Sequence, residues 1–411
     1  MKNKRLFPTI TVTKKAEFSI KKGHPWVYDA EIVEIDDSSG NKIENGELTD
    51  IFSLKGSYLG TGFYNSNSKI RVRILSSNAN EKFERSFYER RIRYAIEYRK
   101  TIMKNNLSCC RLIFGESDGL PGLTVDKFSD ILVIQVLSYG LDKIKDMLYE
   151  ILYETLVSGG EKISGIYERN DVAIRELEGL EQYKGWHEKI PHILKTETEI
   201  CENGIYYRVD FENGQKTGFF LDQKYNRAAV AELSQGKTVL DCFTHTGSFA
   251  LNAAYGGAAH VTAVDISASA IECAKNNACR NNLESKIDFV IANVFDLLPQ
   301  LESERKYKYD FIILDPPAFT KSRKTIESAE RGYKEINYRA MKLLPRGGYF
   351  ATCSCSHFMS RELFEKMLKS AANDAGVSLR QIEARQQAPD HPILWNVPET
   401  DYLKFYIFQI I

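Results

Sequence analysis

The 411-residue sequence lacks a long apolar run, because no stretch in it approaches the ~18 consecutive residues that span a membrane. It also lacks a secretory start, in which a charged segment leads into an apolar one. We therefore expect no membrane partner and a cytoplasmic location. The hydrophobic content of 43% is ample for packed cores, and the length predicts two or three domains.

Cysteine is scarce, with eight residues whose spacings form no regular framework. Small secreted domains use dense, regularly spaced cysteines as disulfides, so this chain is expected to keep reduced thiols. Reduced thiols stay available as nucleophiles or as metal ligands.

The formal net charge is zero, because 55 Lys and Arg residues balance 55 Asp and Glu residues. This balance counts against a strongly basic nucleic-acid-binding protein. The charges are unevenly spread, however: basic residues exceed acidic ones in residues 1–100, and the reverse holds in residues 101–200. One basic surface for RNA and an ordinary solvated face both fit this distribution.

Residues 237–282 carry the pattern around which the rest of the chain is organised. A β-branched, apolar run ends in Asp241 and is followed by a small-residue turn and a helical pattern. A second run at 260–264 ends in Asp265, and a helix is predicted over 268–277. In such a βαβ unit both carboxylates lie at the carboxyl edge of neighbouring parallel strands, where these sheets bind ligands. Asp265 lies 24 positions after Asp241, about the distance at which a ribose-binding acid is expected.

Glycine is scarce in the turn after Asp241, which keeps only Gly247. A dinucleotide site needs three glycines so that the backbone can approach the pyrophosphate, so NAD is disfavoured. S-adenosylmethionine has a ribose and an adenine but no phosphate, and it tolerates a bulkier turn. Aspartates that only cap helices are the structural alternative for this stretch.

Two later segments repeat the pattern of a buried strand that ends in reactive side chains. A predicted strand over 309–315 ends in Asp315, and another over 347–357 carries Cys353 and Cys355. With these the chain resembles the class I methyltransferases that use S-adenosylmethionine, and specifically the 5-methylcytosine ribosomal RNA methyltransferases of the RlmI-like group. The resemblance covers nearly the full length, and its marks are Gly23-His-Pro-Trp-Val27, Gly115-Glu-Ser-Asp-Gly-Leu-Pro-Gly122, Gln215-Lys-Thr-Gly-Phe-Phe-Leu-Asp-Gln223, the Asp241 turn, Asp315-Pro-Pro-Ala-Phe319, Thr352-Cys-Ser-Cys-Ser356 and Ala388-Pro-Asp-His-Pro392.

The resemblance implies an α/β fold whose Rossmann-like methyltransferase sheet is mostly parallel, with an antiparallel last strand. It implies a PUA-type β-barrel that binds RNA over residues 1–76, a small α+β linking domain over 77–196, and the methyltransferase domain over 197–411. The residues themselves predict a β-rich start, a helix over 85–103 and a hairpin over 123–136. The implied partner is ribosomal RNA of the large subunit, naked or partly assembled, and a homodimer is left open.

By resemblance the cofactor is S-adenosylmethionine, held by residues that follow the strand ends. Asp265 is expected on the ribose, and Phe219 is expected beside the methionine part. Family members commonly carry aspartate where Asn293 stands, but asparagine can still accept a hydrogen bond from the adenine amine. The residues predicted to bind the cofactor are Phe219, Asp241, Phe243, Thr244, Thr246, Gly247, Asp265, Ile266, Asn293, Val294 and Asp315.

Carbon 5 of cytosine is a poor nucleophile, so its methylation needs a covalent detour. A cysteine thiolate adds to carbon 6, and a base later removes the proton from carbon 5. In the related enzymes the nucleophile is the cysteine of a Thr-Cys-Ser step, which matches Cys353 and leaves Cys355 as the second candidate. Asp315 is expected to hold the polar edge of the base and to assist the proton movements. Alternation along a strand predicts Cys353, Cys355 and His357 on one face.

Three other readings of these residues stay open. The two cysteines and His357 could bind a metal, but they offer three ligands at most and lack a second cysteine pair at zinc spacing, so no metal is predicted. They could be inert buried thiols, in which case Asp315-Pro-Pro-Ala-Phe319 would grip an exocyclic amine as in amine methyltransferases, with Phe319 stacked on the base. A non-catalytic RNA-binding protein of the same fold is the third reading, and the set of strand-end acids disfavours it.

Two clusters of basic residues are candidates for RNA contact. One precedes the Gly23 step, and the other lies in the segment 321–339, next to the candidate catalytic loop. Lysine and arginine there could clamp the RNA backbone, and an aromatic ring could stack on a flanking base. A solvated helix explains the same segment. The residues predicted to bind RNA are Lys21, Lys22, Lys321, Arg323, Lys324 and Tyr333.

Overall fold

The computed structural model describes residues 7–36, 42–304, 309–320 and 322–411. The chain divides into two compact units and passes between them several times. Of the helices in the described residues, none combines the length and the apolar character needed to cross a membrane. Unit 1 holds Met1–Thr198, Val209–Phe219 and Pro389–Thr400, and unit 2 holds Glu199–Arg208, Phe220–Ala388 and Asp401–Ile411.

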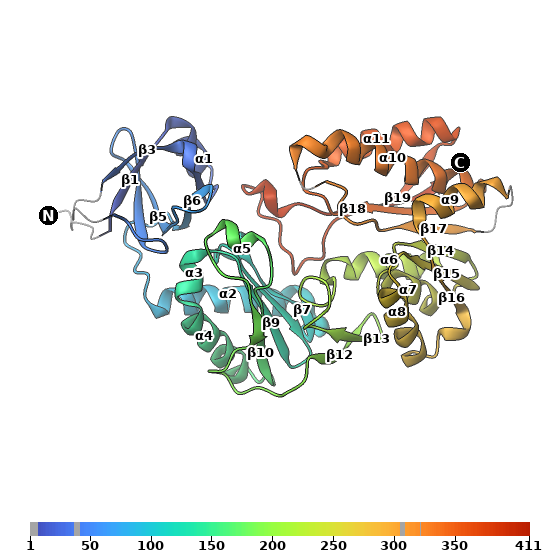
Figure 1. The fold of residues 1–411 in the computed structure, drawn as a ribbon, viewed down its shortest axis with the longest axis horizontal. Coiled ribbons are helices and arrows are strands. Elements are labelled where there is room, and N and C mark those ends of the chain that lie inside the picture. Colours follow the sequence, from blue (N-terminus) through green and yellow to red (C-terminus); the bar gives the residue numbers. More distant parts are fainter. Residues whose placement is uncertain (1–6, 37–41, 305–308, 321) are drawn as a thin grey trace. The chain divides into compact units, whose positions relative to one another are not determined.

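Unit 1 begins with a six-stranded sheet, drawn in blue in Figure 1. Its elements are β1 (Thr9–Val12), α1 (Lys14–Lys21), β2 (Trp26–Tyr28), β3 (Ile32–Asp36), β4 (Leu48–Ser53), β5 (Tyr58–Tyr64) and β6 (Ile70–Ser76). The strand order is β2-β6-β5-β4-β1-β3, and only β1 and β4 pair in parallel. Inward-facing Ile10, Val12, Val27, Ile51 and Val72 are fully buried, so alternating apolar residues build this core. The predicted β-rich start is confirmed.

A second, five-stranded sheet follows in unit 1. Its elements are α2 (Arg85–Met103), β7 (Cys109–Phe114), β8 (Leu123–Phe128), β9 (Ile131–Val136), α3 (Tyr139–Lys143), α4 (Lys145–Ser158), β10 (Gly165–Arg169), α5 (Ile174–Leu177) and β11 (Lys184–Trp186). The strand order is β11-β10-β9-β8-β7. The helix over 85–103 and the β8–β9 hairpin are confirmed. The predicted division of the chain into three domains stays a prediction.

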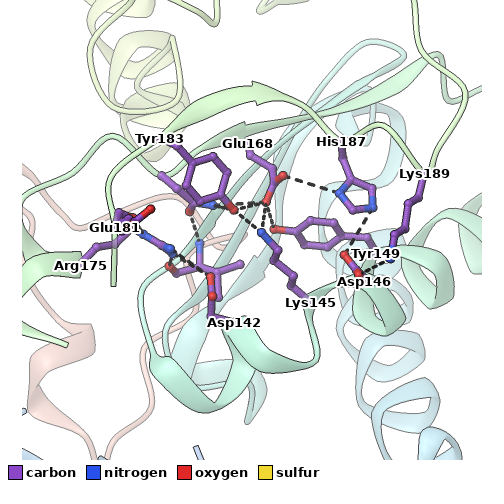
Figure 2. Close-up of polar contacts among 12 residues, drawn as sticks. Asp142, Lys145, Asp146, Tyr149, Glu168, Arg175, Glu181, Tyr183, His187 and Lys189 are labelled. Atoms are coloured by element: carbon purple, nitrogen blue, oxygen red, sulfur yellow. Dashed lines mark hydrogen bonds and ion pairs between the residues drawn. The ribbon is translucent and has the colours of Figure 1, made fainter. Parts of the chain in front are cut away.

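A buried polar network ties β10 to α4 in this part of unit 1 (Figure 2). The carboxylate of Glu168 accepts hydrogen bonds from the hydroxyls of Tyr149 (3.0 Å) and Tyr183 (2.6 Å). The ammonium group of Lys145 lies 3.3 Å from the same oxygen, and Nδ1 of His187 lies 3.6 Å from the other. Because Glu168 is buried, its charge depends on these partners.

Replacing Glu168 by glutamine should leave Lys145 without a carboxylate partner and loosen β10. We expect the free energy of opening, measured by hydrogen exchange of the β10 amides, to fall by about 1–3 kcal/mol. Glu188→Gln is the matched control, since that side chain is 83% exposed and should change the exchange little. Equal protection of β10 in both variants would contradict a stabilising role for the network.

Unit 2 is built on a seven-stranded sheet with helices on both faces. Its strands are β14 (Thr238–Cys242), β15 (His260–Asp265), β16 (Ile287–Ile291), β17 (Phe311–Leu314), β18 (Tyr349–Ser354), β19 (Leu379–Arg385) and β20 (Lys404–Ile410). Its helices are α6 (Lys224–Leu233), α7 (Ser248–Tyr255), α8 (Ala268–Arg280), α9 (Val294–Ser303), α10 (Ile326–Leu343) and α11 (Arg361–Ala375). Before it, β12 (Glu197–Glu202) and β13 (Ile205–Asp210) form a two-stranded sheet.

The sheet order in unit 2 is β16-β15-β14-β17-β18-β20-β19. The first five strands are parallel, and β20 runs antiparallel between β18 and β19, as predicted. Helices α6, α7 and α8 cover one face and α9, α10 and α11 the other (Figure 1). Buried Phe249, Ala250, Ala253 and Ala254 are the stripe by which α7 packs. This is a doubly wound sheet, whose ligands bind beyond the carboxyl ends of the strands.

Candidate active site

Four neighbouring strands bring reactive side chains to one edge of the unit 2 sheet. Asp241 lies near the end of β14, Asp265 ends β15, Asp315 follows β17, and Cys353 lies near the end of β18. The order β15-β14-β17-β18 makes these strands adjacent. Since all four are parallel, the side chains gather at the carboxyl edge that the sequence predicted.

Asp241 is fully buried and only half satisfied by the chain itself. Its Oδ2 accepts hydrogen bonds from the hydroxyl of Thr244 (2.5 Å) and the amide of Ala250 (2.9 Å), whereas Oδ1 has no partner among the described residues. Burial raises the pKa of the carboxyl to about 7, and the charges of Asp315 and Asp265 add to the rise. A buried acceptor without a donor costs free energy, so Oδ1 is suited to a ligand that donates.

The turn after β14 holds its shape through backbone conformations that few residues adopt. Phe243 and His245 have positive φ angles of 65° and 50°, and Gly247 has a φ of 81°. A Cβ atom on Gly247 would lie 2.9 Å from Cβ of Ala274, so glycine also allows α7 to approach α8. The carbonyl of Thr246 accepts a hydrogen bond from Asn277 (3.2 Å), which fixes the turn to α8.

Asp265 is held by the same turn. Its Oδ2 accepts a hydrogen bond from the amide of His245 and its Oδ1 from the amide of Ser267, each at 2.9 Å. These bonds orient a partly exposed carboxylate at the strand end, where a ribose-binding acid is expected. The next residue, Ile266, is 70% exposed, which leaves an apolar surface beside that acid.

The two predicted cofactor-binding residues after β16 differ in their surroundings. Asn293 is exposed and caps α9, because its Oδ1 accepts from the amide of Phe295 (3.1 Å) while its Nδ2 donates to Asp296 (3.0 Å). Val294 is 2% exposed and belongs to the core. A side-chain contact of Val294 with a ligand is therefore not expected, and the role of Asn293 stays a prediction.

Cys353 and Asp315, two of the predicted catalytic residues, are in direct contact. Leu314 pairs with Thr352 across β17 and β18, so the residues that follow them meet at the sheet edge. The Sγ of Cys353 donates to Oδ1 of Asp315 at 2.8 Å. Burial raises the pKa of the Asp315 carboxyl to about 6, against the opposing effect of the bond from Cys353.

Gln223 joins this pair from a third element. It ends the short 3-10 turn Leu221–Gln223, and its Nε2 lies 3.2 Å from Oδ1 of Asp315 and 3.4 Å from Sγ of Cys353. Its side-chain oxygen Oε1 accepts a hydrogen bond from Nδ2 of Asn226 on α6 at 2.6 Å, and this bond fixes the orientation of the Gln223 amide. Gln223 therefore contacts both the thiol and the carboxylate, and it lies at the end of the segment 215–223 that carries one mark of the family resemblance.

The environment of Cys353 opposes its ionisation in the resting state. The side chain is fully buried, and burial together with the Asp315 carboxylate raises the pKa of the thiol well above its usual range. Cys355 is partly exposed, and β18 ends at Ser354, one residue before it. The alternation that predicted Cys353, Cys355 and His357 on one face therefore applies only up to Ser354.

One predicted RNA contact is wrong. Tyr333 lies on α10 with no exposed surface, and its hydroxyl accepts a hydrogen bond from Ser354 at 3.0 Å. Its ring packs on Phe319 with centroids 4.6 Å apart. Tyr333 is therefore a core residue that supports the end of β18, and it cannot stack on a base.

The other predicted RNA contacts lie in exposed segments where the structure describes them. Lys21 and Lys22 are exposed in unit 1, with Lys21 paired to Glu17 and the Nζ of Lys22 4.3 Å from the ring centroid of Phe18. Lys324 is exposed in unit 2. Arg323 belongs to the 3-10 turn Arg323–Thr325, but its side chain is outside the described part. Lys321 lies outside the described residues, so its role stays a prediction.

The residues present fit S-adenosylmethionine. Asp241 Oδ1 is a buried acceptor without a partner, Asp265 is an oriented acid at the ribose position, and Ile266 offers apolar surface for a purine ring. Phe219 belongs to unit 1, and its contact with the methionine part stays a prediction. Among the residues that the structure describes, no three His, Cys, Asp or Glu side chains are grouped to hold a metal ion.

The sequence reasoning missed Lys404. This lysine opens β20 and is 3% exposed, and its ammonium group donates to the carbonyl of Ser356 at 2.7 Å. Its signal was a single charge at the start of the apolar run that ends the chain, at a position that the antiparallel strand pairs with Ser354. Lysine is almost never fully buried unless it is paired, so a buried lysine here indicates a structural or functional role.

Two family models match separate regions of the chain. Residues 10–77 match a PUA-like domain, and residues 187–408 match an S-adenosylmethionine-dependent methyltransferase. The second match covers more than half of the chain. The matches agree with the expected PUA-type domain near the start of the sequence and the expected methyltransferase fold in its second half.

Several relatives align along the whole chain. Ribosomal RNA large subunit methyltransferase I of Pseudoalteromonas translucida is 41% identical over 397 residues, which is 95% of this chain and 96% of that protein. The protein of the same name from Klebsiella pneumoniae is 38% identical over 99% of both chains. A solved structure from Streptococcus mutans shares the fold, with a TM-score of 0.81 at 21% identity, over 98% of this chain and 99% of that one. Another, complexed with SAH, gives 0.82 at 22% identity over the same shares.

Proposed function

The chain belongs to the family of S-adenosylmethionine-dependent enzymes named ribosomal RNA large subunit methyltransferase I, and from this premise we propose its reaction. We infer that it methylates carbon 5 of a cytosine in 23S ribosomal RNA, with Cys353 as the nucleophile. The substrate is naked or partly assembled large-subunit RNA with the target base turned out of its stack. A homodimer and a cytoplasmic location stay predictions.

The observation that carries this proposal is the 2.8 Å contact between Sγ of Cys353 and Oδ1 of Asp315. A thiol attacks as its thiolate, so a thiol with a raised pKa needs a nearby acceptor for its proton. The Asp315 carboxyl, with a pKa of about 6, is mostly ionised at neutral pH and accepts that hydrogen bond. Proton transfer to Asp315 creates a thiolate without adding net charge to the site.

The chain then acts on the pyrimidine through a covalent adduct. The Cys353 thiolate adds to carbon 6, which turns carbon 5 into a nucleophile. S-adenosylmethionine supplies an electrophilic methyl group for that carbon. After methylation a base removes the proton from carbon 5, and the carbon–sulfur bond breaks to release Cys353 as a thiolate. Gln223 keeps the thiol and the carboxylate in register through its two contacts.

The second candidate reaction is methylation of an exocyclic amine on the RNA base. Asp315-Pro-Pro-Ala-Phe319 resembles the amine-gripping loop of such enzymes, and the buried state of Cys353 fits an inert thiol. Phe319 is only partly buried, so some of its ring surface is available for a base. The short thiol–carboxylate contact favours the carbon 5 reaction, because an amine methyltransferase has no use for it.

Base identification tests the reaction directly. Purified protein is incubated with labelled S-adenosylmethionine and large-subunit ribosomal RNA from cells that lack the enzyme, and the nucleosides are identified by mass spectrometry. The proposal predicts labelled 5-methylcytidine. A label on an exocyclic amine would transfer support to the second candidate, and no label in RNA would contradict both.

Donor binding is expected to depend on pH through Asp241. We propose that its free Oδ1 faces the positively charged part of S-adenosylmethionine, so binding requires the ionised carboxyl. Since the pKa of Asp241 is raised to about 7, the affinity should rise by about tenfold per pH unit below 7 and level off above it. Calorimetry at several pH values, in buffers of different ionisation enthalpy, would detect the released proton.

Two variants separate this effect from general pH dependence. Asp241→Asn should bind the donor more weakly and should lose the extra proton release. Asp288→Asn is the control, because that carboxylate is exposed and pairs only with His260 among the described residues. An unchanged pH dependence in Asp241→Asn would show that Asp241 does not ionise on binding.

A further inference from the structure

Lys404 is a buried cation on β20, and it lies beside the end of β18, the strand that carries the candidate nucleophile. It is the first residue of β20 and the cross-strand partner of Ser354, the last residue of β18. Only 3% of its surface is exposed. A lysine this buried normally has a carboxylate partner, because an unpaired charge in the interior is costly.

The contacts of Lys404 are with carbonyl groups. Its Nζ donates to the carbonyl of Ser356 at 2.7 Å and to that of Tyr402 at 2.8 Å. It takes part in no ion pair among the described residues, and Asp401 lies 3.9 Å from Arg361 instead. Because Lys404 pairs with Ser354 and reaches the carbonyl of Ser356, it spans the backbone on both sides of Cys355.

The electrostatics of this edge explain what such a cation could do. Asp315 and the two thiols bring several potential anions together, and burial followed by the charge of Asp315 raises the pKa of the Cys353 thiol. Burial lowers the pKa of Lys404 to about 8, while Cys355 and then Asp401 oppose that effect and Arg361 adds to it. The interaction between Lys404 and Cys355 is mutual, so a charged lysine favours a thiolate there.

We propose that Lys404 is a positioning residue, which holds the segment after β18 through the carbonyl of Ser356 and supplies a buried positive charge next to Cys355 that favours thiolate formation at this end of β18. This role rests on the proposed cysteine chemistry. The proton of Cys353 moves to Asp315 when the thiolate forms, and Lys404 remains protonated throughout. The arrangement fails when Lys404 loses its proton, so its benefit is confined to pH values below about 8.

Thiol alkylation measures this effect without any methyl transfer. Rates of reaction of Cys353 and Cys355 with iodoacetamide are followed by peptide mass spectrometry from pH 6 to 9. Lys404→Met keeps the length and packing of the side chain but removes its charge, and Lys404→Arg keeps the charge. At pH 7 we expect Cys355 to react about tenfold more slowly in the methionine variant and within about threefold of wild type in the arginine variant.

A comparison of two cysteines within the wild-type protein tests the proposal even if Lys404→Met does not fold. The ratio of the alkylation rate at pH 7 to that at pH 9 should be larger for Cys355 than for the exposed Cys279. Equal rates in wild type and a folded Lys404→Met, or a ratio for Cys355 no larger than for Cys279, would overturn the proposal. Unchanged calorimetric affinity for S-adenosylmethionine identifies the variant as folded.

The outcome is separable from that of the proposed reaction. If RNA is methylated on an amine while alkylation still depends on Lys404, only the cysteine mechanism fails. If 5-methylcytidine forms while the alkylation rates do not depend on Lys404, only the proposed role of Lys404 is wrong. In the methylation assay a positioning role predicts a lower kcat for Lys404→Met with an altered pH profile and an unchanged KM for the donor, and Lys404→Arg should recover part of the rate.

Discussion

Cys353→Ala is expected to abolish methylation of large-subunit ribosomal RNA while leaving S-adenosylmethionine affinity nearly unchanged. Without the sulfur no covalent bond forms at carbon 6, and carbon 5 stays too weak a nucleophile to take the methyl group. A loss of at least ~10³-fold in kcat is expected, as for other enzymes that lose a nucleophile. Single-turnover transfer of labelled methyl groups would measure it, and calorimetry would measure donor binding.

Cys355→Ala is the matched control two residues along the chain. This thiol is partly exposed and lies one residue beyond the end of β18, whereas Cys353 lies within the strand and donates to Oδ1 of Asp315. The variant should retain most of its rate. Full activity of Cys353→Ala with loss in Cys355→Ala would assign the nucleophile to Cys355, and full activity of both would favour methylation of an amine.

Asp315→Asn is expected to have the second largest effect. Asparagine can hold the same position beside Cys353, but it cannot accept a proton from the thiol. Removal of a general base commonly costs ~10²–10⁴-fold in rate, so we expect a kcat reduced by about that factor. The low-pH limb of the rate profile should also disappear, since in the wild type activity rises as Asp315 ionises near its pKa of about 6.

Asp310→Asn provides the control at the opposite end of the same strand. Asp310 precedes β17, is exposed, and accepts a hydrogen bond from the amide of Thr238 at 2.9 Å. It lies at the amino edge of the sheet, away from the donor. Its variant should keep both the rate and the pH profile. A similar loss in both variants would mean that Asp315 acts through the stability of the sheet.

The strands of unit 2 that carry the candidate site could be predicted from the sequence because an acidic or reactive residue lies at the end of each apolar run. Buried parallel strands appear as short apolar runs, and their order places the residue after each run at the carboxyl edge. The positions of Asp241, Asp265 and Asp315 follow from this rule alone. The β8–β9 hairpin and α2 were found in the same way, from alternation and from helical spacing.

Side-chain orientation could not be read in this way. Tyr333 stands among basic residues in the sequence, yet the face of α10 that carries it packs into the core. Asn293 keeps its predicted place after β16, but capping of α9 engages its amide. The contacts of Gln223 with Asp315 and Cys353 join segments more than 90 residues apart, so no local pattern reports them.

Lys404 illustrates the same limit. A lysine at the start of an apolar strand is usually at the surface, where its charge is hydrated. Only the pairing of β20 with β18 shows that this one is covered and reaches the carbonyl of Ser356. Tertiary structure, and not local propensity, decides whether a charge of this kind is solvated or structural.

Trapping the covalent intermediate tests the central claim most directly. In 5-fluorocytosine, fluorine replaces the carbon 5 hydrogen that the base must remove before the carbon–sulfur bond can break. Large-subunit RNA that contains this base should therefore stay bonded to the enzyme after methyl transfer from S-adenosylmethionine. Mass spectrometry of the digested complex should find a methylated fluorocytidine on the peptide that carries Cys353. The account would be contradicted by the absence of any adduct under conditions where unmodified RNA is methylated, or by an adduct on another residue.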